Sequence, residues 1–249
     1  MPRARYDRIR PTFIESWPAA VAALSVPQRC VRLSDSEIGD LLAAHHWSLV
    51  NGQIRESAAL RELQDRLDAA VKEFPGGAIV RTGVRSPKDS PAALRDGLRV
   101  VDARAALLRL AQSSRVVDDL RLQLHHGDAP RLFARRWVEW EPWTELRCFM
   151  RGRRLIGVSQ YDCKGLGFQP ALVERAGELH QAVRGFFEEF RSAVHLDDVV
   201  FDVAVVQGRA VLIELNPFSR ASDACLFDWD HLERFDGSFR CVQPTAPRA

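Results

Sequence analysis

The spacing of hydrophobic residues changes near residue 130. Before that point, apolar residues recur every three or four positions, most clearly from Glu56 to Phe74, which predicts an amphipathic helix there. Shorter helices are expected from the capping pair Ser34-Asp35 to about His46, and over 102–112 and 115–126. One strand, AIVRTGV (78–84), is predicted in this half, followed by a turn and a short helix within 86–93, whereas residues 1–33 look irregular.

The second half is rich in predicted strands. Alternating and continuous apolar runs predict strands in LFARRWVEW, TELRCFM and RRLIGVSQ, with a tight connection at Arg151-Gly152. Pro170 is expected to start a long helix reaching about Val194. VVFDVAVV and AVLIELN follow as strands joined by a short turn at Gly208, and the tail after Asp223 looks aromatic, then proline-rich and frayed. This order predicts an α+β chain with two lobes, residues 1–130 and 131–249.

Composition narrows the classes of protein to consider. With 249 residues, 46% of them hydrophobic, the chain can bury a substantial core, and its formal net charge of +2 excludes a polycation. A nucleic-acid partner is therefore not expected. The five cysteines form no C-x-x-C pair, and no stretch is apolar for long enough to span a bilayer, so we expect a cytoplasmic protein without a membrane partner.

Acidic and amide side chains interrupt the last two predicted strands. Glu214 and Asn216 lie in LIELN, and Asp202 lies in VVFDVAVV. A buried carboxylate without a partner costs several kcal/mol, roughly, so each acid needs compensation. An oxygen-only ligand set favours magnesium, with manganese as the alternative ion. The competing interpretation is that arginines pair with both acids and that Asn216 caps a turn before Pro217.

The length of the hairpin connection decides which side chains share a face. Side chains alternate along a strand, so Glu214 and Asn216 point the same way. A three-residue connection at 207–209 places Asp202 directly across from Glu214, whereas a two-residue turn places them on opposite faces. A shared metal site therefore predicts an odd-length connection around Gly208.

Four blocks together resemble a known family. VVFDVAVV…AVLIELNPFSRASDACLFDW, ELRCFMRGRRLIGVSQYD, IVRTGVRSPKDS and ARRWVEW occur in order within residues 79–230. The combination resembles the cell division cycle protein 123 family, a divergent branch of the ATP-grasp superfamily. The resemblance implies a two-lobed ATP-grasp fold with an antiparallel sheet in the C-terminal lobe, a nucleotide cleft between the lobes, and bound ATP and Mg²⁺.

The resemblance also assigns roles to individual residues. The metal ligands would be Asp202, Glu214 and Asn216, with Glu214 where the family often has aspartate. Arg147 would be catalytic and reach the phosphates, and Arg81 stands where the family usually has a lysine. The remaining implied nucleotide contacts are Ser86, Lys88 and Asp89 on the turn after the strand, and Arg136, Trp137, Val138 and Glu139 in the segment that would hold adenine.

Two functions follow from the resemblance. The first is a carboxylate–amine ligase that forms an acyl phosphate from ATP and passes the acyl group to a small-molecule, peptide or protein acceptor. The second is an ATP-dependent assembly chaperone for a protein partner such as a translation factor. The loop YDCKGLGFQ lacks the family's tyrosine-rich run. Trp137, Trp140 and Trp143 lie near arginines and could stack on bases, but packing in the interlobe segment is the favoured interpretation because net charge is nearly neutral.

Overall fold

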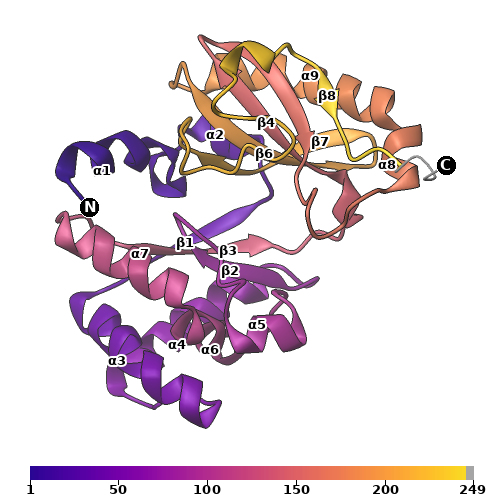
Figure 1. The fold of residues 1–249 in the computed structure, drawn as a ribbon. Helices are drawn as coiled ribbons and strands as arrows, with labels where there is room; N and C mark the ends of the chain where they lie inside the picture. The colour runs from indigo at the N-terminus through magenta and orange to yellow at the C-terminus, as the bar shows by residue number, and fades with distance from the viewer. Residues whose placement is uncertain (245–249) are drawn as a thin grey trace. The chain divides into compact units, whose positions relative to one another are not determined.

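The computed structural model describes residues 1–244, and these residues form two compact units (Figure 1). The first unit comprises Met1–Tyr6 and Pro27–Val138. The second comprises Asp7–Val26 and the chain from Glu139 onward. The chain passes from the first unit to the second after Val138, and the N-terminal segment Asp7–Val26 belongs to the second unit.

A three-stranded antiparallel sheet and a set of helices make up the first unit. The strands follow the order β1-β3-β2, and their bounds are β1 (Gln28–Arg32), β2 (Ala78–Thr82) and β3 (Arg131–Arg136). The helices are α3 (Asp35–Asn51), α4 (Ala58–Lys72), α5 (Pro91–Asp96), α6 (Ala103–Gln112) and α7 (Ser114–His125). The predicted cap at Ser34 is confirmed, because its hydroxyl accepts from Glu37 N while the Glu37 carboxylate accepts from Ser34 N.

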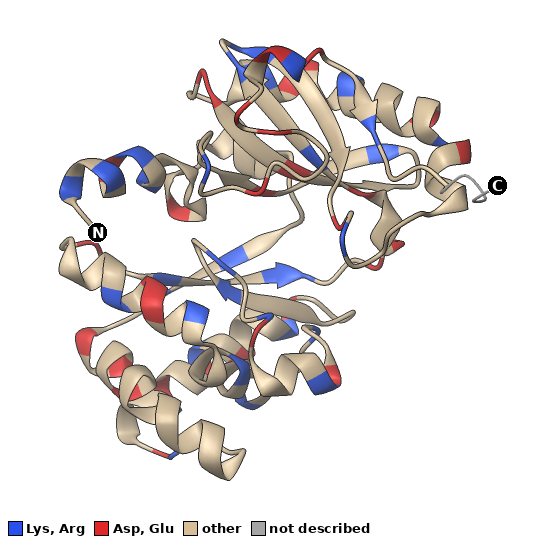
Figure 2. Cartoon of the chain, viewed as in Figure 1, with Lys and Arg blue, Asp and Glu red and all other residues tan. Residues whose placement is uncertain are grey.

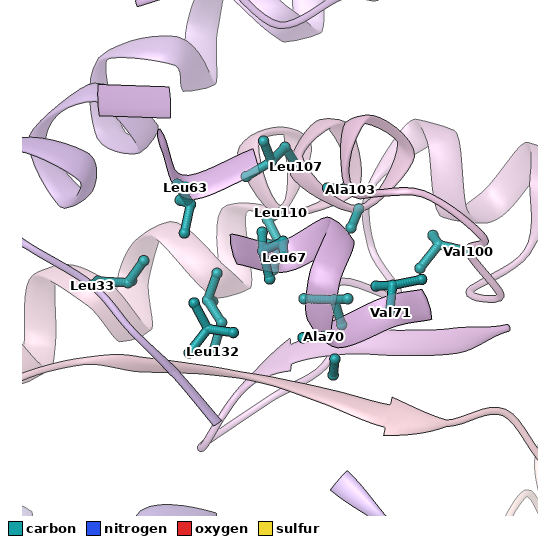
Figure 3. Close-up of a cluster of buried hydrophobic side chains, with 14 of the residues drawn as sticks. Leu33, Leu63, Leu67, Ala70, Val71, Val100, Ala103, Leu107, Leu110 and Leu132 are labelled. Carbon is teal, nitrogen blue, oxygen red and sulfur yellow. The ribbon is translucent and has the colours of Figure 1, made fainter. Parts of the chain in front are cut away.

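Leucine side chains form the core of the first unit (Figure 3). Leu63 and Leu67, four positions apart on α4, are fully buried, as are Leu107 and Leu110 on α6 and Leu132 on β3. Full burial of a leucine stabilises the fold by about 1.5–3 kcal/mol. The periodic apolar face of the predicted helix over residues 56–74 therefore faces the unit's core.

The second unit is built on a five-stranded sheet with the order β7-β6-β4-β5-β8. Phe201 on β6 packs against Phe190 with ring centroids 4.4 Å apart, and also against Phe186 and Phe187, so helix α9 (Ala176–Ala193) covers one face of the sheet. Asp202, the next residue, points to the other face. The strands are β4 (Glu145–Arg151), β5 (Arg154–Gln160), β6 (Val199–Val206), β7 (Arg209–Asn216) and β8 (Phe239–Arg240).

Several expectations about individual elements are wrong. Residues 1–33 are not irregular, because they contain helices α1 (Arg3–Ile9) and α2 (Ala19–Ala23) and strand β1. The long helix from Pro170 is interrupted at Arg175, which separates α8 (Pro170–Glu174) from α9. The strand predicted through Trp140 ends at Arg136. Short 3-10 helices cover Arg10–Thr12, Ile14–Ser16, Pro142–Thr144 and Leu232–Arg234.

The aromatic segment after Asp223 belongs to the core of the second unit. Phe149 on β4 is fully buried and meets Phe227, Trp229 and Phe235 edge-on, with centroid distances of 5.4, 5.8 and 5.1 Å. Aromatic edges against aromatic faces add to the stabilisation that burial supplies. The end of the predicted frayed tail, 245–249, lies outside the described residues. Along residues 1–244, every helix is too short or too polar to cross a membrane.

Candidate functional site

The connection between β6 and β7 is a two-residue turn. Val206 pairs with Arg209, and Gln207 and Gly208 both have positive φ, 50° and 77°. Positive φ at both central residues is the hallmark of the type I′ turn that suits the twist of a β-hairpin. The prediction of a three-residue connection is therefore wrong.

Asp202 nevertheless lies directly across from Glu214, because β7 contains a bulge. The register shifts by one residue between Asp202 and Val203, so that Val203 pairs with Leu212 while Asp202 pairs with Glu214. Ile213 is the extra residue on β7. A bulge resets the alternation of side chains, so Glu214 returns to the face that carries Asp202.

An ion pair inside the sheet balances the negative charge of the Asp202 carboxylate. Arg147 is the residue opposite it on β4, and the guanidinium donates from Nε to Oδ1 and from Nη2 to Oδ2, both at 2.8 Å. The side chains are 7% and 1% exposed. Burial lowers the pKa of Arg147, but the Asp202 carboxylate outweighs it and holds the pKa well above the ordinary arginine value. For Asp202, the arginine-pairing interpretation left open by the sequence describes the observed contact.

Asn216 bridges the two acids. Its Nδ2 donates to Asp202 Oδ2 at 3.1 Å and lies 3.4 Å from Glu214 Oε1. Two carboxylates and one amide therefore converge on one face, and Glu214 and Asn216 are only half-buried. In residues 1–244, no group of three or more His, Cys, Asp or Glu is placed to hold a metal. Mg²⁺ uses few protein oxygens and takes its other ligands from water and phosphate, so metal binding by Asp202, Glu214 and Asn216 stays a prediction.

Loops after β5 and β7 border this constellation. The Arg147 guanidinium lies over the Tyr161 ring, 4.8 Å from its centroid, and its Nη1 donates to the Asp223 carbonyl at 3.0 Å. Lys164 Nζ pairs with Asp223 Oδ2 at 2.8 Å and so connects the two loops. Burial raises the pKa of Tyr161, and the Asp202 and Glu214 carboxylates raise it further. Burial likewise raises the pKa of Cys225 to about 12.

Tyr161, Lys164 and Asp223 were not predicted as part of the site. Their signal in the sequence was position, because Tyr161 directly follows a predicted strand and Asp223 lies a few residues beyond LIELN. Loops at strand ends carry functional residues more often than strand interiors do.

The predicted phosphate contacts of the first unit are engaged in local bonds. Arg81 is buried, and its guanidinium donates to the carbonyls of Thr82 and Val84 at 3.1 and 2.9 Å. The Asp89 carboxylate accepts from Ser113 Oγ at 2.5 Å and from Arg115 N at 3.1 Å. Contact of Arg81 and Asp89 with phosphate stays a prediction, as it does for half-buried Ser86 and exposed Lys88.

The predicted adenine segment follows β3. Arg136 is the exposed last residue of the strand, and Trp137 N donates to the Gly77 carbonyl at 2.9 Å. Val138 ends the first unit and Glu139 begins the second part of the other. Their contact with adenine also stays a prediction.

Comparisons with known proteins assign the family. The profile of the D123 family matches residues 35–247. An eIF2 translation initiation factor assembly protein from Schizosaccharomyces pombe is 30% identical over 187 residues, which cover 70% of this chain and 57% of that protein. The corresponding protein from Candida albicans is 28% identical, with coverage of 69% and 53%. The chain spans about half the length of these curated relatives.

A solved structure shows the same fold. Cdc123 from Schizosaccharomyces pombe superimposes with a TM-score of 0.78 at 23% identity, covering 96% of this chain and 98% of that chain. The expected α+β fold is confirmed, and the sheet of the second unit is antiparallel from β7 through β5, with the two-residue strand β8 added in parallel to β5. Because the family profile spans most of the sequence, the chain belongs to the D123 family.

Proposed function

We propose that the chain binds ATP with Mg²⁺ and uses it to control binding or assembly of a protein partner of the translation-factor class, in the cytoplasm. The support for a protein partner is that the curated relatives carry the name eIF2 assembly protein. The support for ATP is the resemblance of the hairpin, the arginine-bearing strand and the phosphate turn to the ATP-grasp pattern.

The observation that carries the proposal is the convergence of Asp202, Glu214 and Asn216 on one face beside Arg147. Asp202 and Glu214 would hold the cation, and Asn216 would complete the protein's share of the ligands. When bound, Mg²⁺·ATP supplies a polarised terminal phosphoryl group. Arg147 holds Asp202 in place from inside the sheet, and the neutral Tyr161 closes one side of the site without adding charge.

A ligase acting through an acyl phosphate is the second candidate. It shares the hairpin and the nucleotide, and it differs only in forming a covalent product. Tyr161 and Cys225 both keep their protons at neutral pH, because their pKa values are raised, so neither acts as a ready nucleophile. The names of the relatives favour assembly over ligation.

Calorimetric titration of ATP with Mg²⁺ into Glu214→Gln tests the site. The variant keeps the shape of the side chain and removes one charge, so we expect magnesium-dependent ATP binding to be lost while the far-UV spectrum is unchanged. Glu189→Gln is the matched control, since Glu189 is exposed on α9, which packs on the other face of the sheet. Unchanged binding by Glu214→Gln would contradict the metal site.

An assay of the products formed from ATP distinguishes the assembly function from the ligase function. With labelled ATP, candidate amino acids and purified translation-factor subunits, assembly predicts a complex whose affinity depends on nucleotide and whose subunits keep their masses. Ligation predicts ADP release together with a new covalent product. A mass increase in an acceptor would therefore favour the second candidate, and nucleotide-independent partner binding would contradict the first.

A further inference from the structure

A basic pocket lies in the second unit between the start of β5 and helix α9. Its volume is about 370 Å³, and the residues that matter here are Arg154, Leu155, His180, Arg184, Phe187 and Arg191. Four of them follow the helical spacing of α9, so one face of that helix presents two arginines and a histidine beside a phenylalanine.

The pocket is separate from the acidic hairpin. Phe187 stacks on Phe201 with centroids 6.3 Å apart, which places α9 on the face of the sheet opposite Asp202. A ligand in the pocket is therefore shielded from the hairpin acids by the sheet itself.

Among the residues that the structure describes, two of the three pocket arginines have no ionic partner. Arg191 pairs with Glu188 at 2.5 Å. Within residues 1–244, neither Arg154 nor Arg184 makes a hydrogen bond or an ion pair through its guanidinium. Burial lowers the pKa of His180, and the Arg184 charge lowers it further, as expected where positive charge is uncompensated.

We propose that this pocket binds an acidic segment of a protein partner, with a glutamate or aspartate side chain held by Arg154 and Arg184 and an apolar neighbour resting on Leu155. The planar guanidinium donates paired hydrogen bonds to a carboxylate, so two such groups without another partner in the described residues form a donor site for a carboxylate. Leu155 and Phe187 supply an apolar floor that suits a peptide. The inference rests on the proposed function only in taking the partner to be a protein.

The surroundings favour a short acidic peptide over a nucleic acid. Glu188 lines the pocket, while Asp197 and Asp198 lie close to the neighbouring β4–β5 turn, where they contact Arg153 and Gly152. These carboxylates would repel an extended phosphate backbone but leave room for one or two acidic side chains. Figure 2 shows Lys and Arg interspersed with Asp and Glu in the unit rather than gathered in one continuous stripe.

The test measures binding of a fluorescein-labelled peptide of alternating glutamate and leucine by anisotropy. The double variant Arg154→Glu/Arg184→Glu should weaken binding at least about tenfold, because attraction is replaced by repulsion. Arg209→Glu is the control, since Arg209 is an exposed residue at the β6–β7 turn, the opposite end of β6 from the β4–β5 turn that precedes Arg154. Arg154→Gln/Arg184→Gln, with a smaller expected loss, replaces the reversal variant if that variant fails to fold.

Three outcomes would overturn the proposal. They are absence of peptide binding by the wild-type chain, an equal loss with Arg209→Glu, and displacement of the peptide by an RNA oligonucleotide at lower concentration than by unlabelled peptide. The peptide titration uses the wild-type chain without nucleotide, so its result does not depend on whether the chain binds ATP. A failure of ATP binding with the peptide site intact would then count against the proposed function alone.

Discussion

At the scale of residues, the buried pair Arg147–Asp202 determines how the hairpin tolerates its acids. Both carboxylate oxygens accept from the guanidinium, and Asn216 donates to one of them as well. The protein itself therefore supplies the opposite charge for one of the two carboxylates, that of Asp202. The free-energy cost expected of a buried acid without a partner does not arise at Asp202, because Arg147 supplies the opposite charge from β4.

Removing Arg147 should destabilise the whole fold rather than affect nucleotide binding alone. Arg147→Met leaves a carboxylate that is 1% exposed without its partner, which costs about 3–5 kcal/mol. Arg147→Met/Asp202→Leu should recover much of that loss, because no buried charge remains. Urea denaturation of the single and double variants measures the coupling. Additive effects would show that the two side chains are energetically independent.

Asp89 was predicted to contact phosphate, but in the structure it caps the start of α7, and a substitution can distinguish the two roles. Its carboxylate accepts from Ser113 and Arg115 N at the start of α7, so Asp89→Ala should lower the free energy of unfolding by about 1 kcal/mol at neutral pH. Folded Asp89→Ala should still bind ATP if the cap is its main role. Asp65→Ala, at an exposed position on α4, is the control for stability.

The Asp89 effect should depend on pH in a defined direction. Burial raises the pKa of this carboxyl, but the Ser113 hydroxyl and the Arg115 amide outweigh it and hold the pKa below the ordinary value of 3.8. The stabilisation is therefore fully present above that ordinary value and is lost as pH falls through the lower folded-state pKa. Urea denaturation at neutral and acidic pH should show the gap between wild type and Asp89→Ala closing on the acid side. A constant gap would contradict a charged cap.

At the scale of elements, the bulge in β7 places the candidate site. Leu212 and Leu215 are both buried although they are three positions apart, and an unbulged strand would send them to opposite faces. The extra residue, Ile213, lets both leucines face the core while Glu214 faces Asp202. The spacing Leu-x-x-Leu inside a strand was the signal for this bulge, and it was overlooked when the register was predicted from the turn alone.

Deletion of Ile213 tests the bulge in β7 while keeping Asp202 paired with Glu214. The deletion leaves Leu212 opposite Val203 and Glu214 opposite Asp202 in a regular ladder, so the fold should survive. The strand loses its local bend, however, and Glu214 and Asn216 are aimed differently, so affinity for ATP with Mg²⁺ should fall at least about tenfold. Circular dichroism measures whether the fold survives, and calorimetry measures the affinity for ATP with Mg²⁺. Wild-type affinity in a folded deletion variant would show that the bulge has no part in binding.

Elements with their own periodic signal could be predicted from the sequence. The helix over residues 56–74 and the strands around Arg147, Asp202 and Glu214 have apolar patterns that hold regardless of their neighbours. Strand β1 could not be predicted in this way, because its residues Gln28–Arg32 are mostly exposed and it exists through pairing with β3. The aromatic segment after Asp223 was missed for the same reason, since Phe149, far away in sequence, defines its position.

At the scale of the whole molecule, the second unit is discontinuous in sequence. Residues 7–26 belong to it although the next 112 residues, 27–138, belong to the first unit. This arrangement has a physical reason. Leu212 N donates to the Leu24 carbonyl at 2.9 Å and Ser25 Oγ donates to the Leu212 carbonyl at 2.6 Å, so the N-terminal segment covers the open edge of β7.

A fragment starting at Glu139 should therefore fail to fold well by itself. It lacks Phe13, Trp17 and Val21, which are buried in the intact chain, and it leaves the edge of β7 open to pairing with other copies. Joining residues 7–26 to its N-terminus through a flexible linker should restore a cooperative thermal transition and a monomeric elution volume. Residues 27–138 serve as the comparison, because their leucine core is nearly continuous in sequence and should fold without the other unit. A stable monomer from the fragment that starts at Glu139 would show that residues 7–26 are not needed for the second unit to fold. Equal instability of both fragments would show that neither unit folds independently.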